Sequence, residues 1–477
     1  MDFPFVGQAY TARSLNVDAQ RCFNLYPEVD PTGKNVVALY GTPGLLRLAT
    51  CAAAQQVRGL KTSGAYLYAV SGNQASRFDV NWTETVLGTI GTTSGPVSME
   101  TNGTQLMIVD GASGYIVTES SGAFAQIVDV DFPAGTDLVG FLDGFFLVNS
   151  NGTQKFYISA SYDGTSWAAL DFSSVEGSPD NIISFIVDHR EAWFFGSQST
   201  EVFTNTGNAT FPIQRIQGAF IEQGCVALFS VAKMDNSIFW LGRDERGDGV
   251  VWKANGYVPQ RVSTHAIETA IRSYSTKSDA IAYTYQADGH NFYVLTFPSA
   301  GKTWVYDASP GTGWHERGYR NPASGNYSRH RSNCHAFFNG KNVVGDFQNG
   351  KLYELSPTTY TDDGDAIVSL RACQHISDKD ENVEMVYHRL EVLVEAGVGL
   401  QSGQGSAPLM LMRHSKDGGH TWSSQLTSSM GAVGKYQQRA KWERCGGGRD
   451  KVFEVSISDP VKRVIIGANL RVTKGLA

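Results

Sequence analysis

Two short segments have the residue types and spacing of a known structural motif. Residues 415–422 read Ser-Lys-Asp-Gly-Gly-His-Thr-Trp and fit the Asp-box pattern Ser-x-Asp-x-Gly-x-Thr-Trp, and residues 161–167 are a looser copy. In such a hairpin the Asp accepts hydrogen bonds from turn N–H groups, a Gly takes the left-handed conformation and the Trp packs beneath. The motif supplies no catalytic group, so we interpret both copies as structural turns.

Catalysis by a glycosidase would need two paired carboxylates, or a Tyr nucleophile with basic residues around an acidic sugar. Single candidates such as Glu201 and Asp307 occur, but nothing in the sequence pairs them. His330 and His335 lie outside any zinc-type spacing, and no phosphate-binding glycine loop follows a strand. We therefore predict no catalytic, metal or cofactor site and expect that the protein is not an enzyme. A sialidase-like propeller enzyme and a peptide-binding scaffold propeller stay as alternatives.

Two basic segments contain Arg and Lys interleaved with aromatic residues, a composition typical of protein interfaces and of nucleic-acid contacts. The first contains Arg317, Tyr319, Arg320, Tyr327, Arg329 and Arg331. The second contains Lys435, Tyr436, Arg439, Lys441, Trp442, Arg444, Arg449 and Lys451. We predict that both are exposed and contact partner proteins; a solvated loop is the alternative.

Charge favours proteins over nucleic acid as the partners of these segments. Residues 1–365 carry 24 basic and 35 acidic side chains, net −11, whereas residues 366–477 carry 15 and 11, net +4. Affinity for duplex DNA comes mostly from Lys and Arg neutralising phosphates. An acidic surface therefore suits DNA that slides past without binding.

The composition favours an all-β protein. The 477 residues are 42% apolar and 18% charged, with 51 glycines, which suits many short strands joined by tight turns. Short apolar strands recur every ~40–50 residues, as in the blades of a β-propeller. Their central residues are Leu67, Met107, Phe146, Trp193, Phe239, Tyr293 and Val343. Each is followed by a second strand, centred on Phe78, Ile116, Tyr157, Phe203, Trp252, Tyr306 and Tyr353.

These pairs predict a propeller of seven blades over residues 56–356; unrelated hairpins in two sandwiches are the alternative. Residues 1–55 are irregular in pattern, and we expect an arm that packs across the propeller. One helical pattern begins at His265, with Ile267, Ala270, Ile271 and Tyr274 on one face.

A polar, acidic cluster at residues 356–365 predicts a boundary. The strand-like runs beyond it, at 366–376, 385–395, 408–414, 452–458 and 464–472, predict a β-sandwich-like module over residues 366–477. We expect flexible loops at 397–406 and 445–448.

The six cysteines are scattered and form no Cys-x-x-Cys pair, which indicates reduced thiols. The N-terminus lacks the basic and apolar regions of a secretion signal. No apolar run approaches the ~18 residues of a transmembrane helix. We expect a soluble protein, made in a cytoplasm, with no membrane segment.

Several segments, in this order, resemble the tail-accessory family of short-tailed bacteriophages, also called packaged-DNA stabilisation proteins. The segments are Asn24-Leu25-Tyr26-Pro27, Thr42-Pro43-Gly44-Leu45, Phe195-Gly196-Ser197, Thr200-Glu201-Val202-Phe203, Gln223-Gly224, Ile271-Arg272-Ser273-Tyr274 and Val305-Tyr306-Asp307-Ala308-Ser309. None of them is a catalytic motif. Together they are spread over most of the first 355 residues.

The resemblance implies a structural protein of the virion tail. Such a tail hub would dock beneath the portal and its head–tail adaptor, retain the packaged DNA and carry tail spikes or fibres and a tail needle. It also implies six copies around the tail axis, in contact with one another, with double-stranded DNA passing through the lumen without specific binding. The protein would be made in the cytoplasm of the bacterial host and end in the virion tail.

Overall fold

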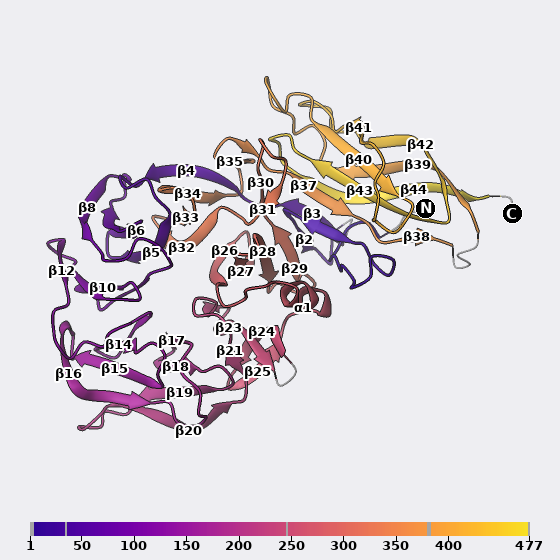
Figure 1. Ribbon diagram of the computed structural model, residues 1–477. Helices are drawn as coiled ribbons and strands as arrows, with labels where there is room; N and C mark the ends of the chain where they lie inside the picture. The colour runs from indigo at the N-terminus through magenta and orange to yellow at the C-terminus, as the bar shows by residue number, and fades with distance from the viewer. Residues whose placement is uncertain (1–3, 34–35, 245–246, 379–382, 476–477) are drawn as a thin grey trace.

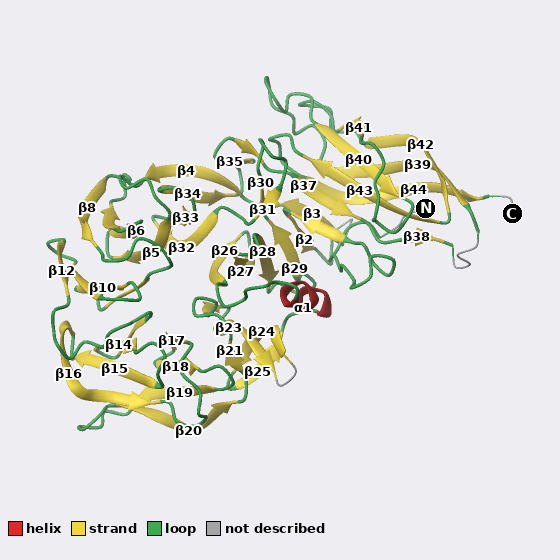
Figure 2. Cartoon of the chain, viewed as in Figure 1, coloured by secondary structure: helices red, strands yellow, loops and turns green. Residues whose placement is uncertain are grey.

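The computed structural model describes residues 4–33, 36–244, 247–378 and 383–475, and their regular secondary structure is almost entirely β-strand (Figures 1 and 2). These residues contain a single α-helix, so the predicted all-β class is confirmed. Figure 1 shows a ring of small sheets and, beside it, a second body of packed sheets that lies near both chain ends.

The ring consists of seven blades. The first contains β5 (Val57–Ser63), β6 (Tyr66–Ser71), β7 (Gln74–Phe78) and β8 (Glu84–Thr89). The second contains β9 (Ser98–Thr101), β10 (Gln105–Val109), β11 (Gly114–Thr118) and β12 (Ala123–Gln126). The third contains β13 (Val139–Leu142), β14 (Phe145–Asn149), β15 (Lys155–Ala160) and β16 (Asp163–Ser174). The fourth contains β17 (Ser184–Asp188), β18 (Glu191–Phe195), β19 (Thr200–Asn205) and β20 (Ile213–Ile221).

The fifth blade contains β21 (Gly224–Cys225), β22 (Ala232–Met234), β23 (Ser237–Asp244), β24 (Gly247–Asn255) and β25 (Val258–Arg261). The sixth contains β26 (Ile281–Ala287), β27 (His290–Phe297), β28 (Lys302–Asp307) and β29 (Trp314–Arg317). The seventh contains β32 (Ser332–Phe338), β33 (Lys341–Asp346), β34 (Lys351–Ser356) and β4 (Gly44–Thr50). The prediction of seven blades is confirmed.

The repeat found in the sequence corresponds to the two central strands of each blade. The central residues of the seven first strands of the repeat, such as Leu67 and Phe146, lie in β6, β10, β14, β18, β23, β27 and β33. The central residues of the seven second strands lie in the strands that follow these in the chain. These strands are apolar because neighbouring blades cover both of their faces. Aromatic rings cross from blade to blade: Phe156 stacks on Phe194 at 4.2 Å, and Phe239 on Tyr293 at 5.6 Å.

A strand from the start of the chain closes the ring. β4 pairs antiparallel with β34, with Leu45 opposite Leu355. The segment 1–55 therefore differs from the irregular arm that we expected, because it contains four strands and one of them completes the seventh blade. Closure in this way covers an edge that the ring would otherwise leave open. The predicted boundary at 356–365 contains most of a small hairpin, β35 (Thr361–Asp362) and β36 (Asp365–Ala366), on the same blade.

The second body is a sandwich of two sheets, as predicted. One sheet contains β2 (Leu25–Val29), β3 (Val37–Gly41), β44 (Val464–Lys474), β39 (Met385–Val394) and β42 (Ala440–Gly448). The other contains β1 (Arg21–Phe23), β37 (Ser369–Ala372), β43 (Asp450–Ile457), β40 (Leu409–Ser415) and β41 (Leu426–Ser429), and β38 (Ile376–Ser377) pairs with β43. Fully buried Leu390, Val392, Met410, Met412 and Val455 form part of the core between them. The expected loop at 445–448 is wrong, since these residues belong to β42.

The propeller and the sandwich share one continuous sheet. β1 lies between β29 of the sixth blade and β37 of the sandwich, with Phe23 opposite both Glu316 and Leu370. Asn24 follows β1 directly and is 2% exposed. Its side chain accepts a hydrogen bond from the Gly318 N–H at 3.0 Å and donates to the carbonyls of Gly318 and Val368, both at 2.9 Å. The two bodies are therefore joined by backbone pairing rather than by a linker.

The helix α1 (His265–Arg272) lies where the sequence predicted it, between the fifth and sixth blades (Figure 2). Thr264 caps its N-terminus by accepting a hydrogen bond from the Ile267 N–H. Ile267 and Ile271 pack into a core shared with Tyr293 and Trp314. Among the described residues, no helix has the length and apolar character needed to cross a membrane.

Candidate partner interfaces

The first predicted interface segment contains a hairpin at the junction of propeller and sandwich. β30 (Tyr319–Arg320) pairs with β31 (Tyr327–Ser328), and Arg320 is exposed next to the tip. The base is fixed, because the Tyr319 hydroxyl donates to Asp365 at 2.9 Å and Tyr327 packs edge-on against Phe23 at 4.9 Å. The hairpin therefore presents residues 320–324 to solvent from a rigid base.

Arg317, by contrast, lies inside the sixth blade. It is 3% exposed, its Nε donates to His315 Nε2 at 3.0 Å, and its guanidinium lies over Phe292 at 4.9 Å. Burial, with the positive charge of Arg317 as a second cause, holds the pKa of His315 well below its usual range. Arg317 is therefore part of the core and does not belong to an exposed interface.

Arg329 is also buried, at 6% exposure, which corrects the expectation of an exposed loop. It stacks on Phe347 at 4.3 Å and donates to the Asn333 side chain at 2.9 Å. Burial lowers the pKa of Arg329 to about 10. The Arg331 side chain is 12% exposed and pairs with Asp365 at 2.5 Å, so it braces the β35–β36 hairpin. Of this basic segment, only Arg320 is largely free to meet a partner.

The second segment divides in the same way. Trp442 is 4% exposed, and its indole N–H donates to the Leu426 carbonyl at 3.0 Å. Lys451 is fully buried between the rings of Tyr387, at 5.0 Å, and Phe453, at 5.3 Å. Burial lowers the pKa of Lys451 to about 8. Both predicted interface residues are therefore core residues of the sandwich.

The rest of the second segment is exposed, and part of it gathers around one carboxylate. Arg439 pairs with Glu391 at 2.6 Å, and Lys441 lies 4.0 Å from the same carboxylate. The Arg439 hydrogen bond is the largest cause that lowers the pKa of Glu391. Tyr436 is 76% exposed. We call Lys435, Tyr436, Arg439 and Lys441 the sandwich ridge.

Arg444 and Arg449 are exposed as well, but they lie away from this group in sequence. Arg444 interrupts β42 with a φ of 58°, and Arg449 stands in the turn between β42 and β43. The structure therefore divides the predicted second interface into a ridge, two separate arginines and two core residues.

The centre of the propeller contains a cavity of about 500 Å³. Residues from all seven blades line it, including Lys61, Val139, Phe185, Ala232, Tyr283 and His335. Glu100 is the one carboxylate among its described lining residues, and it pairs with Lys61 at 2.5 Å. Glycoside hydrolysis by the usual route needs two carboxylates that flank the substrate. Among its described lining residues, the cavity does not supply such a pair.

Both Asp boxes form turns, and the first has the expected left-handed glycines, Gly418 and Gly419. In the looser copy the expected left-handed glycine is wrong, because Tyr162 takes that conformation, with a φ of 57°. Asp417 accepts hydrogen bonds from the Ser415 hydroxyl at 2.6 Å and the Thr421 N–H at 2.8 Å, and these bonds lower its pKa. In the looser copy, Asp163 accepts from the Thr165 N–H at 3.0 Å, while Trp167 is buried beneath. The carboxylates are occupied in holding backbone, which is a structural role.

Metal-ligating clusters and reactive cysteines would be two further kinds of chemical site. Within the described ranges, no group of three or more His, Cys, Asp or Glu side chains could hold a metal ion. All six cysteines are free thiols. Burial raises the pKa of Cys22 and of Cys225 to about 11, so neither is a thiolate near neutral pH.

One basic groove in the structure was not predicted from the sequence. Arg13, Arg21, Arg272 and Lys302 all line the space between an N-terminal loop and α1. No local pattern could have joined them, because they come from three distant parts of the chain. The sequence did contain the amphipathic pattern of α1. That pattern predicted which face of the helix is buried, but not which residues lie across from its exposed face.

Two family models match the chain. One, described as Bacteriophage P22 Gp10, beta-propeller, matches residues 1–360, and the other, described as Bacteriophage P22 Gp10, beta-sandwich, matches residues 375–473. The chain belongs to the bacteriophage P22 Gp10 family. The resemblance found in the sequence is confirmed, and membership of this family makes the chain a phage tail structural protein.

Among curated proteins, no match was found. Solved propellers resemble the chain distantly. The Neurospora crassa Pan2 WD40 domain is 11% identical, with a TM-score of 0.42, over 66% of this chain and 96% of that one. The WD40 propeller domain of Doa1 is 11% identical, with a TM-score of 0.41, over 65% and 97%. Neither likeness bears on function or partners.

Proposed function

We propose that this protein is the tail hub and head-closure factor of its phage. It docks beneath the portal–adaptor ring, retains the packaged DNA, and carries tail spikes or fibres and a tail needle. This proposal goes beyond family membership, which gives only a structural tail protein. The hub acts without enzymatic chemistry. It is made in the host cytoplasm and is incorporated into the virion tail.

The observation that supports the proposal most is the continuous sheet from β26 through β29 and β1 to β43. A hub must transmit load between partners bound at different sites, and backbone pairing resists hinge motion better than a linker does. Asn24 adds hydrogen bonds to both bodies at the crossing. The chain is therefore suited to hold its partners at fixed relative positions.

The exposed basic features supply surfaces for those partners. Arg320 on the β30–β31 hairpin and the sandwich ridge combine cationic and aromatic side chains, which are enriched at protein interfaces. The remaining body is acidic, with net −11 over residues 1–365. Such a wall would let duplex DNA pass through the lumen without holding it.

The proposal is tested with particles assembled without this chain. Packaged heads should form and then lose their DNA, measured as nuclease-sensitive DNA in purified particles. Adding the purified chain to fresh heads should restore protection, and the Arg320→Glu chain should restore less. Heads that keep their DNA without the chain would contradict the closure role.

We also propose that six copies assemble only on the adaptor, as neighbours in a closed ring. Closed rings use head-to-tail contacts, and a template can order contacts that are weak alone. Analytical ultracentrifugation of the purified chain should give a monomer. A stable hexamer without partners would contradict the template, though not the hub.

A further inference from the structure

An N-terminal loop is anchored at both ends, and between them the Gln8 side chain also donates a hydrogen bond to the Gly311 carbonyl at 3.2 Å. Phe5 is fully buried in the sandwich core, and its carbonyl accepts a hydrogen bond from Arg371 Nε at 2.8 Å. At the other end, the His375 ring donates to the Leu15 carbonyl at 2.7 Å, and Ala19 is buried. These contacts fix the loop at both of its ends.

The Asp box of the sandwich supports the second anchor. A Cβ atom added at Gly418 would lie 2.6 Å from the Asn16 side-chain oxygen, and one at Gly419 would lie 3.3 Å from Ala19 Cβ. Both glycines have positive φ, at 71° and 96°. The loop therefore packs closely on this turn, and its conformation is set before any partner arrives.

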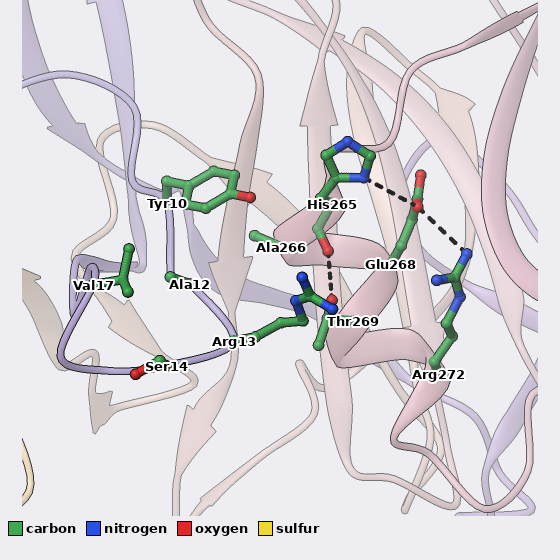
Figure 3. A pocket seen from close by; sticks show the side chains of 10 residues that line it. All are labelled: Tyr10, Ala12, Arg13, Ser14, Val17, His265, Ala266, Glu268, Thr269 and Arg272. Carbon is green, nitrogen blue, oxygen red and sulfur yellow. Dashed lines mark hydrogen bonds and ion pairs between the residues drawn. The ribbon is translucent and has the colours of Figure 1, made fainter.

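A groove runs between this loop and α1. Two cavities of about 480 and 500 Å³ open into it, and Figure 3 shows the loop facing the helix across the first of them. The two cavities adjoin, since four residues line both: Ala12, Arg13, Ala266 and Thr269. Tyr10 and Val17, which are 40% and 74% exposed, stand on the loop side.

The charged side chains of the groove are mostly positive. Those that line it are Arg13, Arg21, Arg272, Lys302, Glu268 and Glu316, four cations against two carboxylates. Glu316 already contacts Arg21 at 2.9 Å and Lys302 at 2.8 Å. Arg13 is exposed, and among the described residues it has no ion pair. On a body of net −11, this groove is a local positive site.

The second cavity has an aromatic floor. Trp304 is partly buried there, and its indole N–H donates to the Tyr274 hydroxyl at 2.9 Å, which fixes the ring. Trp314 lies beside it, 6% exposed. A floor of aromatic rings with cations at its rim suits an apolar side chain flanked by carboxylates.

We propose that this groove is a docking site for an extended acidic segment of a partner protein. One apolar side chain rests on Trp304, and neighbouring carboxylates meet Arg13 and Lys302. Duplex DNA fits less well, because the groove offers few cations while the surrounding body is acidic and repels phosphates. The inference deepens the proposed function and rests on it, since a tail hub needs protein partners.

The test begins with a library of random peptides displayed on yeast and selected for binding to the purified full chain. Enriched sequences should be rich in Asp and Glu around one apolar residue. The enriched peptide is then synthesised with a fluorescent label, and its affinity is measured by anisotropy. Enrichment of neutral or basic peptides, or no enrichment, would overturn the proposal.

Variants locate the site. Arg13→Glu and Lys302→Glu should each raise the Kd of the enriched peptide by about tenfold, equivalent to about 1.4 kcal/mol. Arg190→Glu, the same charge change at an exposed position of the fourth blade (79% exposed side chain), should leave the Kd unchanged. Arg13→Gln, which keeps the side chain near its length, should give a smaller loss. Melting curves identify a variant that fails to fold.

Two outcomes overturn the assignment. Equal Kd values for the wild-type, Arg13→Glu and Lys302→Glu chains would place the peptide elsewhere. Binding of a short DNA duplex that the same two variants abolish, with no peptide binding, would make the groove a nucleic-acid site. Particle DNA retention is measured separately, so failure of this groove and failure of the hub role are distinguishable.

Discussion

Replacing Asn24 with Ala should loosen the junction between propeller and sandwich. The Asn24 side chain makes three hydrogen bonds there, to the N–H and carbonyl of Gly318 and to the carbonyl of Val368. Its backbone has a φ of 52°, a left-handed conformation that Asn tolerates better than Ala does. The change therefore removes hydrogen bonds and adds backbone strain at the same point.

The size of the effect follows from these two parts. Leaving the buried Gly318 N–H without an acceptor costs about 1 to 3 kcal/mol. Holding Ala in the left-handed region costs about 1 to 2 kcal/mol more. The free energy of unfolding should fall by about 2 to 5 kcal/mol for Asn24→Ala and by about 1 to 3 kcal/mol for Asn24→Gly, which carries no strain.

The assay is urea unfolding followed by both far-ultraviolet circular dichroism and tryptophan fluorescence. In the wild-type chain the two signals should change together, because the shared sheet couples the two bodies. In the Ala variant they should separate as the junction opens first. A change of less than about 0.5 kcal/mol for both variants, with coincident transitions, would refute the role of Asn24.

Three further predictions concern buried or capping charges, and a fourth concerns catalysis. Burial raises the pKa of Asp362 to about 7 in the folded chain, whereas a carboxyl in the unfolded chain has a pKa of about 4. The protonated carboxyl therefore favours the folded chain at low pH, and this contribution to the free energy of unfolding is lost as the pH rises from about 4 through about 7. Asp362→Asn should therefore leave the melting temperature at about pH 4 unchanged and raise it at about pH 8, and equal shifts at both would contradict this. Arg329→Glu should lower stability by about 3 kcal/mol or more, because it buries an unpaired charge, whereas the exposed Arg320→Glu should cost under about 0.5 kcal/mol; equal melting curves would be the contrary result. Asp417→Ala should lower the free energy of unfolding in urea by about 1 to 3 kcal/mol, because the turn loses its hydrogen-bond acceptor. The wild-type chain should hydrolyse no glycoside or sialoside. Hydrolysis by the wild-type chain that Asp417→Ala abolishes would contradict the structural role of Asp417.

The blade repeat could be predicted because each blade places short apolar strands at a regular interval. Residues such as Phe146 and Val343 are fully buried between neighbouring blades, and that burial is what makes the period visible in the sequence. The helix at His265–Arg272 was predictable for a similar reason, since its buried face has the 3.6-residue period.

The closure of the ring could not be predicted from local pattern. β4 pairs with β34 across about 300 residues of sequence, and strand pairing at that range leaves no periodic signal. The same holds for β1, β2 and β3, which join the sandwich sheets. An irregular-looking N-terminal segment was in fact the link between both bodies.

The candidate interfaces were only partly predictable, because Arg next to aromatic residues occurs in cores as well as on surfaces. Arg317 lies over Phe292, and Arg329 lies over Phe347. Both arginines are buried. Lys451 lies between two rings in the sandwich. The alternation of inward and outward residues along a strand decides exposure, and that register depends on partners distant in sequence.

The most direct test of the central claim is an electron cryomicroscopy reconstruction of the intact phage particle. The hub proposal predicts density for this chain in a closed ring immediately beneath the portal–adaptor assembly, with the propeller and sandwich in the relative orientation seen here. The sandwich ridge and the β30–β31 hairpin should contact neighbouring proteins, and the lumen wall should be acidic. Finding the chain elsewhere in the particle, or absent from it, would contradict the proposal.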